Sequence, residues 1–146
     1  MTLLLAINIK TLLILAVVTI IAVSCAKFLT HGNKSQPQLP PPYITVGVDD
    51  FQSLIDEGEV QILDVRSQEE FEDGHIAWAV LVDVNNTDFI EKATAILDPA
   101  KPVAVYCRSG RRSARAASQL AARGFMVTNL DGGVIAWQDA GKALVK

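Results

Sequence analysis

Hydrophobic and polar positions divide the chain into an apolar front and an alternating body. From Thr11 to Ser24, fourteen successive residues carry no charge, whereas after Ile44 short apolar runs alternate with helical patterns. Short apolar runs between turn residues are typical of buried strands, and apolar residues spaced three and four apart are typical of helices. The body is therefore predicted to be an α/β domain, and the front needs an explanation of its own.

Five strands and the helices between them are predicted for the body. The strands are expected over residues 44–46, 60–65, 80–84, 103–106 and 125–130. The first helix is expected to be capped by Asp49 or Asp50 and to end at Gly58, and the second to follow the Ser67–Glu70 capping box as far as Gly74. The remaining helices are expected over residues 89–97, 113–123 and 134–140. Strands that alternate with helices in this way pair in parallel, which predicts one domain over residues 44–146, with a mostly parallel five-stranded sheet and helices on both faces.

Composition limits the other classes of protein. The chain has 146 residues, enough for one domain of ordinary size, and half of these residues are hydrophobic. The net charge is only −3 and there is no long basic run, so nucleic acid is not an expected partner. Two cysteines cannot form a disulfide framework. The chain is therefore expected to act on, or bind, something other than nucleic acid.

Residues 1–24 are interpreted as a signal peptide or a signal anchor. Lys10 precedes the apolar run, which at fourteen residues is shorter than the roughly 20 that a membrane-spanning helix needs. The residues from Ala22 to Cys25 resemble a bacterial lipoprotein cleavage site, where a small residue precedes the cysteine that becomes lipidated. Lipidation of Cys25 is the favoured interpretation, and an uncleaved anchor is the alternative.

Residues 25–43 are predicted to join that front to the body as a linker. The segment starts at Cys25, is polar, and contains Pro40, Pro41 and Pro42, a composition that favours an extended spacer. Both interpretations of the front place the body outside the cytoplasmic membrane. The expected location is therefore the cell envelope on its extracytoplasmic, periplasmic side, with the membrane contacted through the N-terminus.

Charge is unevenly divided along the body. Residues 44–100 hold 14 acidic and 2 basic residues, whereas residues 101–146 hold 8 basic and 2 acidic ones. Four of the basic residues lie within nine positions of Cys107, namely Arg108, Arg111, Arg112 and Arg115. Solvated arginines on a helix are the simpler explanation, but their concentration around one cysteine favours an anion-binding site.

Cys107 is the candidate nucleophile. It follows a buried strand, and ligands of α/β sheets bind beyond the carboxyl ends of the strands. The next residues up to Arg112 are expected to form a loop, in which Gly110 permits the unusual backbone angles of an anion-binding nest. A helix N-terminus and nearby arginines favour a thiolate, with a pKa lowered from about 8.5 to roughly 3.5–7.5 in such settings. A buried, inert cysteine is the alternative.

Four segments of the body form a recognisable pattern. They are Leu63-Asp64-Val65-Arg66, Glu70-Phe71-Glu72-Asp73-Gly74-His75-Ile76, Cys107-Arg108-Ser109-Gly110-Arg111-Arg112-Ser113 and Leu130-Asp131-Gly132-Gly133-Val134-Ile135-Ala136-Trp137. In order and spacing they resemble the rhodanese family, and the resemblance covers the whole body. The chain looks like a single-domain thiosulfate sulfurtransferase of the small periplasmic kind.

The resemblance implies a reaction and a set of site residues. Cys107 would take the outer sulfur of thiosulfate, or of another small sulfur donor, and release sulfite. The persulfide so formed would pass its sulfur to cyanide or a thiol. The resemblance implies no metal and no organic cofactor. It also implies a substrate-binding loop that consists of Arg108, Ser109, Gly110, Arg111, Arg112 and Ser113.

The other matched residues are expected to be structural. Asp64 and Arg66 would hold the sheet and a loop together, and His75 would have a satisfied structural role. Trp137 would pack the last helix in the core and line part of the pocket. The chain departs from the family at Trp78, where a glycine is usual, and the bulky side chain puts activity in doubt.

Two other functions are compatible with these residues. Cysteine phosphatases and arsenate reductases use a related loop with five residues between the cysteine and an arginine, whereas only four separate Cys107 from Arg112. The shorter loop suits a sulfur atom better than a phosphoryl group. A persulfide carrier or redox partner module with little thiosulfate activity is the second alternative, because the acidic half and Trp78 could form a partner surface.

Overall fold

The structure is a computed structural model that describes residues 43–146. The signal, the lipidation of Cys25 and most of the linker fall outside those residues, so these predictions stay untested. Within residues 43–146, no helix is long and apolar enough to cross a membrane.

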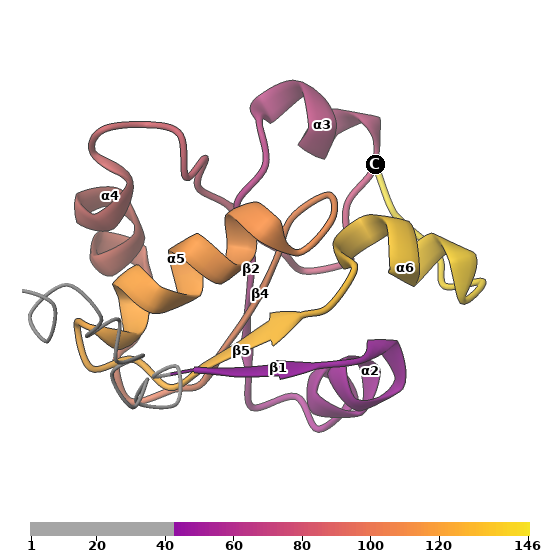
Figure 1. Cartoon of the computed structure of the whole chain (residues 1–146), viewed down its shortest axis with the longest axis horizontal. Helices are drawn as coiled ribbons and strands as arrows, with labels where there is room; N and C mark the ends of the chain where they lie inside the picture. Colours follow the sequence, from indigo (N-terminus) through magenta and orange to yellow (C-terminus); the bar gives the residue numbers. More distant parts are fainter. Residues whose placement is uncertain (1–42) are drawn as a thin grey trace, which may run out of the picture. The chain divides into compact units, whose positions relative to one another are not determined.

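A five-stranded sheet forms the centre of the described domain, in the order β1-β5-β4-β2-β3, and every neighbouring pair is parallel (Figure 1). The predicted parallel sheet is thereby confirmed. The strands are β1 (Ile44–Val46), β2 (Gln61–Asp64), β3 (Val80–Leu81), β4 (Val103–Tyr106) and β5 (Val127–Leu130). The helices are α2 (Val48–Asp56), α3 (Gln68–Asp73), α4 (Phe89–Ile96), α5 (Arg111–Ala121) and α6 (Gly133–Asp139).

Helices cover both faces of the sheet, as predicted. On one face, side chains such as Leu63 and Val105 pack against α4 and α5. On the other, Tyr106 and Leu130 pack against α2 and α6. All four residues of β4 are buried, which agrees with its uninterrupted apolar sequence. The buried central strand therefore fixes the position of its carboxyl end, directly after which Cys107 lies.

Several boundaries differ from the prediction by one or more residues, and three of these differences have a clear structural basis. Gly47, not an aspartate, is the N-cap of α2. Asp49 and Asp50 lie in its first turn, where their negative charges interact favourably with the positive end of the helix dipole. The third strand has only two residues, although the amide of Val82 still donates to the carbonyl of Asp64 at 3.0 Å. Helix α5 begins at Arg111 instead of residue 113 because Gly110, with φ of +86°, turns the chain directly into the helix.

A buried ion pair connects β2 to the loop after α3. The Arg66 Nη2 donates to Asp64 Oδ2 at 2.6 Å and to the carbonyl of Gly74 at 2.8 Å, and both residues of the pair are buried. The same loop is held by the amide of Ile76, which donates to the hydroxyl oxygen of Tyr106 at 3.0 Å. Asp64 and Arg66 thus have the structural role expected of them.

His75 also has structural partners. Its ring stacks on that of Phe71 with 3.7 Å between centroids, and its Nδ1 lies 3.1 Å from the Phe71 carbonyl oxygen. Its backbone exchanges two hydrogen bonds with Val145, which fixes the C-terminal segment to the α3–β3 connection. These contacts account for His75 without a role in chemistry.

Trp78 occupies a backbone conformation that suits glycine. It has φ of +67°, the only positive φ of a non-glycine residue within 43–146, in a turn closed by a 3.1 Å hydrogen bond from the Ala79 amide to the Ile76 carbonyl. Its side chain is 90% exposed, so burial does not compensate for the strain. A left-handed conformation costs an L-residue roughly 1–2 kcal/mol.

Replacing Trp78 with glycine is therefore expected to raise the free energy of unfolding by about 1 kcal/mol. Urea-induced unfolding would measure the change. Trp78→Ala is the matched control, because alanine removes the same exposed ring but keeps the strained φ. Equal stabilities of the glycine and alanine variants would contradict the strain argument.

Candidate active site

Cys107 lies directly after β4, and its side chain is buried, with 1% of the residue exposed. The next three residues form the loop that leads into α5, with Arg108 and Ser109 exposed and Gly110 buried. Arg111 and Arg112 belong to the first turn of α5, not to the loop as predicted, and Ser113 is buried beneath it. The structure therefore places all seven predicted site residues at one end of β4, around the cysteine.

The turn before α6 supports this loop from behind. The amide of Val134 donates to the carbonyl of Cys107 at 2.9 Å, and that of Ile135 to the carbonyl of Arg108 at 3.1 Å. A Cβ on Gly133 would lie 2.3 Å from the carbonyl oxygen of Cys107, so only glycine permits this approach. The Asp131-Gly132-Gly133 segment was matched to the family by sequence, but its contact with the cysteine loop was not foreseen.

The environment of Cys107 favours its thiolate. Burial raises the pKa of the thiol, whereas hydrogen bonds from Ser113, Ser109 and Gly110 lower it. Together the hydrogen bonds outweigh burial, so that the pKa lies below the ordinary value. The Ser113 hydroxyl lies 3.4 Å from the Cys107 Sγ and 3.1 Å from the carbonyl oxygen of Gly110. Donors directed at the sulfur stabilise its charged form. This environment favours a nucleophilic role for Cys107 over that of an inert core residue.

Replacing Ser113 with alanine is expected to raise the pKa of Cys107, because the thiolate loses a hydrogen-bond donor. The rate of alkylation by iodoacetamide against pH reports this pKa. In the unaltered chain its midpoint should lie below that of an ordinary cysteine thiol, and in Ser113→Ala it should move to higher pH. Ser118→Ala, at an exposed position of the same helix, is the control. An unchanged midpoint in Ser113→Ala would contradict this account of the thiolate.

Arg112 is paired with a carboxylate that the sequence reasoning did not connect to the site. Its Nη1 and Nη2 donate to the two carboxylate oxygens of Glu70 at 2.7 and 2.6 Å. The hydrogen bond from Arg112 lowers the pKa of Glu70 to about 2, partly opposed by burial and aided by the amide of Ser67. Glu70 therefore serves both the capping box of α3 and the position of Arg112. The Ser67–Glu70 motif was recognised, but only as a cap.

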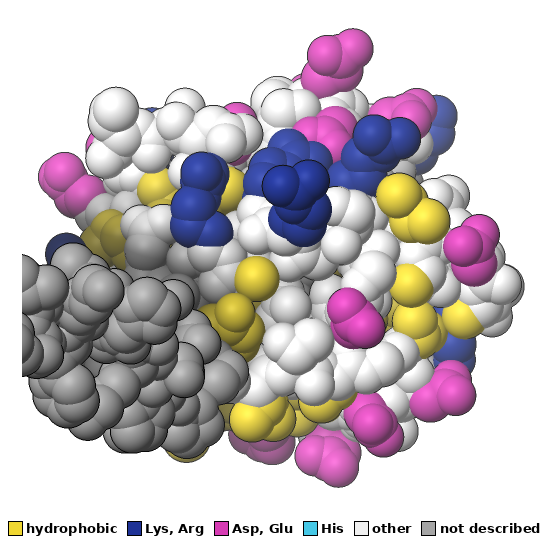
Figure 2. Space-filling view, viewed as in Figure 1, with side chains coloured by type: hydrophobic (Ala, Val, Ile, Leu, Met, Phe, Trp, Pro, Cys, Tyr) yellow, Lys and Arg dark blue, Asp and Glu magenta, His cyan; other side chains and the backbone are white. Residues whose placement is uncertain are grey.

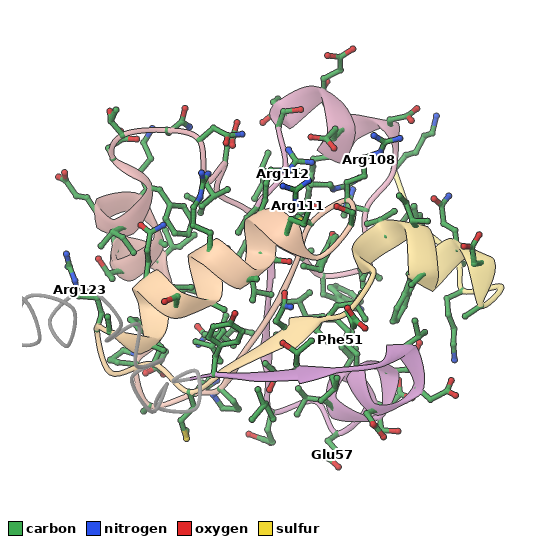
Figure 3. All side chains as sticks on the ribbon, in the orientation of Figure 1. Phe51, Glu57, Arg108, Arg111, Arg112 and Arg123 are labelled. Atoms are coloured by element: carbon green, nitrogen blue, oxygen red, sulfur yellow. The ribbon has the colours of Figure 1, made fainter. Side chains whose placement is uncertain are left out.

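The other three arginines differ in their partners. Arg115 donates to the carbonyl of Val84 at 3.1 Å and to Asn85 Oδ1 at 3.0 Å. Within the described residues, the side chains of Arg108 and Arg111 have no ion-pair or hydrogen-bond partner. Figure 3 shows Arg108, Arg111 and Arg112 together beside α3, whereas Arg123 lies at the far end of α5.

These arginines line a hollow of about 430 Å³ at the surface of the loop and helix turn that follow Cys107, although Cys107 itself is not among the lining residues. Its lining consists of Arg108, Ser109, Arg111, Arg112 and Arg115, with no acidic residue among them. Figure 2 shows basic side chains gathered on this face, with acidic side chains adjoining them. Among residues 43–146, no group of three or more His, Cys, Asp or Glu side chains could hold a metal ion. The arrangement suits an anionic ligand next to a thiolate.

The two tryptophans lie away from this hollow. Trp137 is buried against Phe51, with 6.3 Å between ring centroids, and its Nε1 donates to the carbonyl of Ala143 at 3.0 Å. It lines a separate shallow cavity together with Trp78. The expected core role of Trp137 is confirmed, but it does not line the hollow at the arginines, and Trp78 does not fill it.

Comparisons with known proteins agree on a family. The model of the rhodanese-like domain family matches residues 47–140. The thiosulfate sulfurtransferase 18 of Arabidopsis thaliana is 37% identical over 108 residues, which cover 66% of this chain and 79% of the relative. A tRNA uridine(34) hydroxylase of Chlamydia abortus is 37% identical over 97 residues, but these cover only 30% of that protein. The crystal structure of a rhodanese-related protein from Thermoplasma volcanium superimposes with a TM-score of 0.64 at 30% identity, covering 70% of this chain and 98% of the other.

Proposed function

This chain belongs to the rhodanese-like domain family, and from that premise we propose that it is a thiosulfate sulfurtransferase that carries sulfur as a persulfide on Cys107. The observation that supports the proposal most strongly is the environment of this cysteine. The pKa of its thiol is lowered, and the residues that follow it line a hollow that is basic and contains no carboxylate. A thiolate nucleophile and a dianionic substrate both require such a site.

The first half-reaction is a displacement at sulfur. The thiolate of Cys107 forms a bond to the outer sulfur of thiosulfate, the bond between the two thiosulfate sulfurs breaks, and its electron pair leaves with sulfite. In the second half-reaction a thiophile attacks the outer sulfur of the persulfide and releases Cys107 as a thiolate. Covalent catalysis thus replaces one difficult transfer with two easier ones.

The loop and the arginines have separate roles in this mechanism. The donors of Ser113, Ser109 and Gly110 stabilise negative charge on the sulfur of Cys107. The guanidinium groups around the hollow would attract the dianion and pair with its sulfonate oxygens. Positioned donors of this kind stabilise charge without reorganisation during the reaction.

A persulfide carrier or redox partner module is the alternative function. A segment similar to this domain makes up 30% of a tRNA uridine(34) hydroxylase, so the fold alone does not imply thiosulfate as donor. The basic hollow favours the enzyme, because recruitment of a free dianion needs it.

Production of thiocyanate from thiosulfate and cyanide tests the proposal. Steady turnover by the purified chain supports the sulfurtransferase. A chain that accepts sulfur from another persulfide but not from thiosulfate would overturn the choice of donor and favour the carrier. Turnover of an aryl phosphate in place of thiosulfate would favour the phosphatase class instead.

Replacing Arg112 with alanine is expected to raise the KM for thiosulfate about tenfold, equivalent to about 1.4 kcal/mol. The change removes a cation and leaves the carboxylate of Glu70 unpaired beside the site, and both effects disfavour a dianion. Steady-state kinetics at low ionic strength would measure it. Arg123→Ala, which removes the same charge at the far end of α5, is the control. An unchanged KM in Arg112→Ala would contradict the role of this residue in recruiting the anion.

A further inference from the structure

We propose that Trp78 and the shallow cavity beside it form a docking site for a basic segment of a partner protein. In this arrangement an arginine of the partner stacks on the exposed indole of Trp78 and pairs with the carboxylate of Asp56. The inference goes beyond the proposed function and does not depend on it, because neither residue lines the hollow at the arginines. It follows from the exposure of Trp78, from the size and lining of the cavity, and from the charge around it.

Trp78 is a large side chain that the fold holds out in solvent. It is 90% exposed, the largest fraction among the exposed large hydrophobic residues of 43–146. The turn that carries it is fixed, because Ile76 is buried, its amide donates to the hydroxyl oxygen of Tyr106 at 3.0 Å, and the Ala79 amide closes the turn. An aromatic ring on a fixed turn loses little conformational freedom on binding, and tryptophan is enriched among the residues that contribute most to interfaces.

The conformation of Trp78 costs the free domain stability. Its φ of +67° is unfavourable for an L-residue, and its ring buries little surface against the rest of the domain. Conformations of this kind occur preferentially at functional sites. A partner that covers the ring would bury the apolar surface that the domain by itself leaves in solvent.

The cavity beside Trp78 has the size of one or two side chains. Its volume is about 280 Å³, just below the range of roughly 300–1,000 Å³ that is typical of pockets for whole small-molecule ligands. Its lining includes the apolar side chains of Ile55, Ile76 and Trp137 together with the carboxylate of Asp56. The aliphatic part of a long basic side chain can therefore lie on the apolar lining while its charged end reaches the carboxylate.

Asp56 is the carboxylate of this cavity. It accepts a hydrogen bond from the Gln52 Nε2 at 2.7 Å, but within residues 43–146 it has no ion-pair partner. Lys142 also lines the cavity, and it lies 4.0 Å from Asp49 instead. A guanidinium between Asp56 and the indole of Trp78 would combine an ion pair with a cation–π contact, which favours arginine as the residue that docks here.

The surface next to the cavity is acidic, which selects a basic partner. Residues 48–60, which comprise α2 and the turn after it, include no basic residue and five exposed acidic ones, namely Asp49, Asp50, Asp56, Glu57 and Glu59. Figure 2 shows acidic side chains gathered where α2 lies, and Figure 3 shows Glu57 on the outer side of that helix. Such a surface attracts a basic segment, whereas it repels nucleic acid and anionic lipid.

Binding of a model peptide tests the proposal. The probe is a capped peptide with three arginines separated by glycine and serine, and its matched form carries citrulline, an uncharged side chain of similar shape, at the same positions. Binding of each dye-labelled peptide to the purified chain is followed by fluorescence anisotropy at low ionic strength. We expect the arginine peptide to bind at least about tenfold more tightly than the citrulline peptide, and the difference to shrink as salt screens the charges.

Substitutions at the cavity separate docking from general attraction between charges. Trp78→Ala and Asp56→Asn are each expected to weaken binding of the arginine peptide by at least about fivefold, and Trp78→Phe much less, because phenylalanine keeps an aromatic face. Trp78→Gly, which is expected to stabilise the fold, should weaken binding as Trp78→Ala does, so the loss cannot come from unfolding. The controls Ile96→Ala and Glu91→Gln remove an exposed apolar side chain and an acidic charge from α4, on the other face of the sheet, and should change the affinity little.

The inference would be overturned by equal affinities of the two peptides, by the absence of measurable binding, or by an affinity that Trp78→Ala leaves unchanged. Binding to phosphatidylcholine vesicles that depends on Trp78, without binding of the peptide, would assign the surface to a membrane instead. Self-association in analytical ultracentrifugation that is lost in Trp78→Ala, again without binding of the peptide, would assign it to a second copy of the chain. None of these measurements involves sulfur transfer, so their failure would leave the proposed function intact.

Discussion

Replacing Cys107 with serine is expected to lower thiosulfate turnover by at least about 10³-fold while leaving the fold intact. Serine is nearly the same size as cysteine, so the buried position after β4 can accept it. Its hydroxyl stays protonated near neutral pH and cannot carry a sulfane sulfur. The production of thiocyanate measures the loss, and circular dichroism with urea-induced unfolding reports whether the fold is kept.

The second cysteine of the chain provides an internal control for that variant. Cys25 remains in Cys107→Ser and keeps a free thiol when the chain is produced without lipidation, so general thiol chemistry with thiosulfate would still be possible. Residual turnover close to that of the unaltered chain would show that sulfur moves through another group. The assignment of Cys107 as the sulfur carrier would then be wrong.

Replacing Asp64 with alanine is expected to lower the free energy of unfolding by about 3–5 kcal/mol. The change leaves the guanidinium of Arg66 buried without its carboxylate partner, to which it now donates at 2.6 Å. An uncompensated buried charge costs far more than the pair contributes. The connection between β2 and the loop after α3 would also loosen, because Arg66 holds that loop through the carbonyl of Gly74.

Urea-induced unfolding measures this loss, and Asp88→Ala is the matched control. Asp88 pairs with Lys92 at 2.9 Å on the surface, where both side chains are about half exposed. Its removal is expected to change stability little, because exposed ion pairs are screened and contribute little. Similar losses in the two variants would contradict the view that burial gives the Asp64–Arg66 pair its importance.

Most of the fold could be predicted from the sequence because its local signals agree with one another. The uninterrupted apolar run at 103–106 predicted the central strand, and the capping box at Ser67 predicted α3 with its end at Gly74. The third strand was predicted too long, because Val82 and Val84 are buried apolar residues that leave regular pairing. A run of hydrophobic residues predicts that a segment is buried, but it does not distinguish a strand from an extended loop that packs on the core.

The candidate site was predicted less completely than the fold. Cys107 and its arginines were found because they are neighbours in the sequence, and a loop at a strand end keeps such neighbours together. The pairing of Arg112 with Glu70 joins residues that are 42 positions apart, and the support from Gly133 comes from yet another element. Contacts of this kind depend on the order of strands in the sheet, which no single motif specifies.

Mass spectrometry of the purified chain after brief incubation with thiosulfate tests the central claim most directly. We predict a gain of one sulfur atom, about 32 Da, on the peptide that contains Cys107, absent in Cys107→Ser. Cyanide should then remove the added sulfur, and thiocyanate should appear in equal amount. No gain on Cys107, in a folded chain whose thiol is reduced, would contradict the account of this protein as a thiosulfate sulfurtransferase.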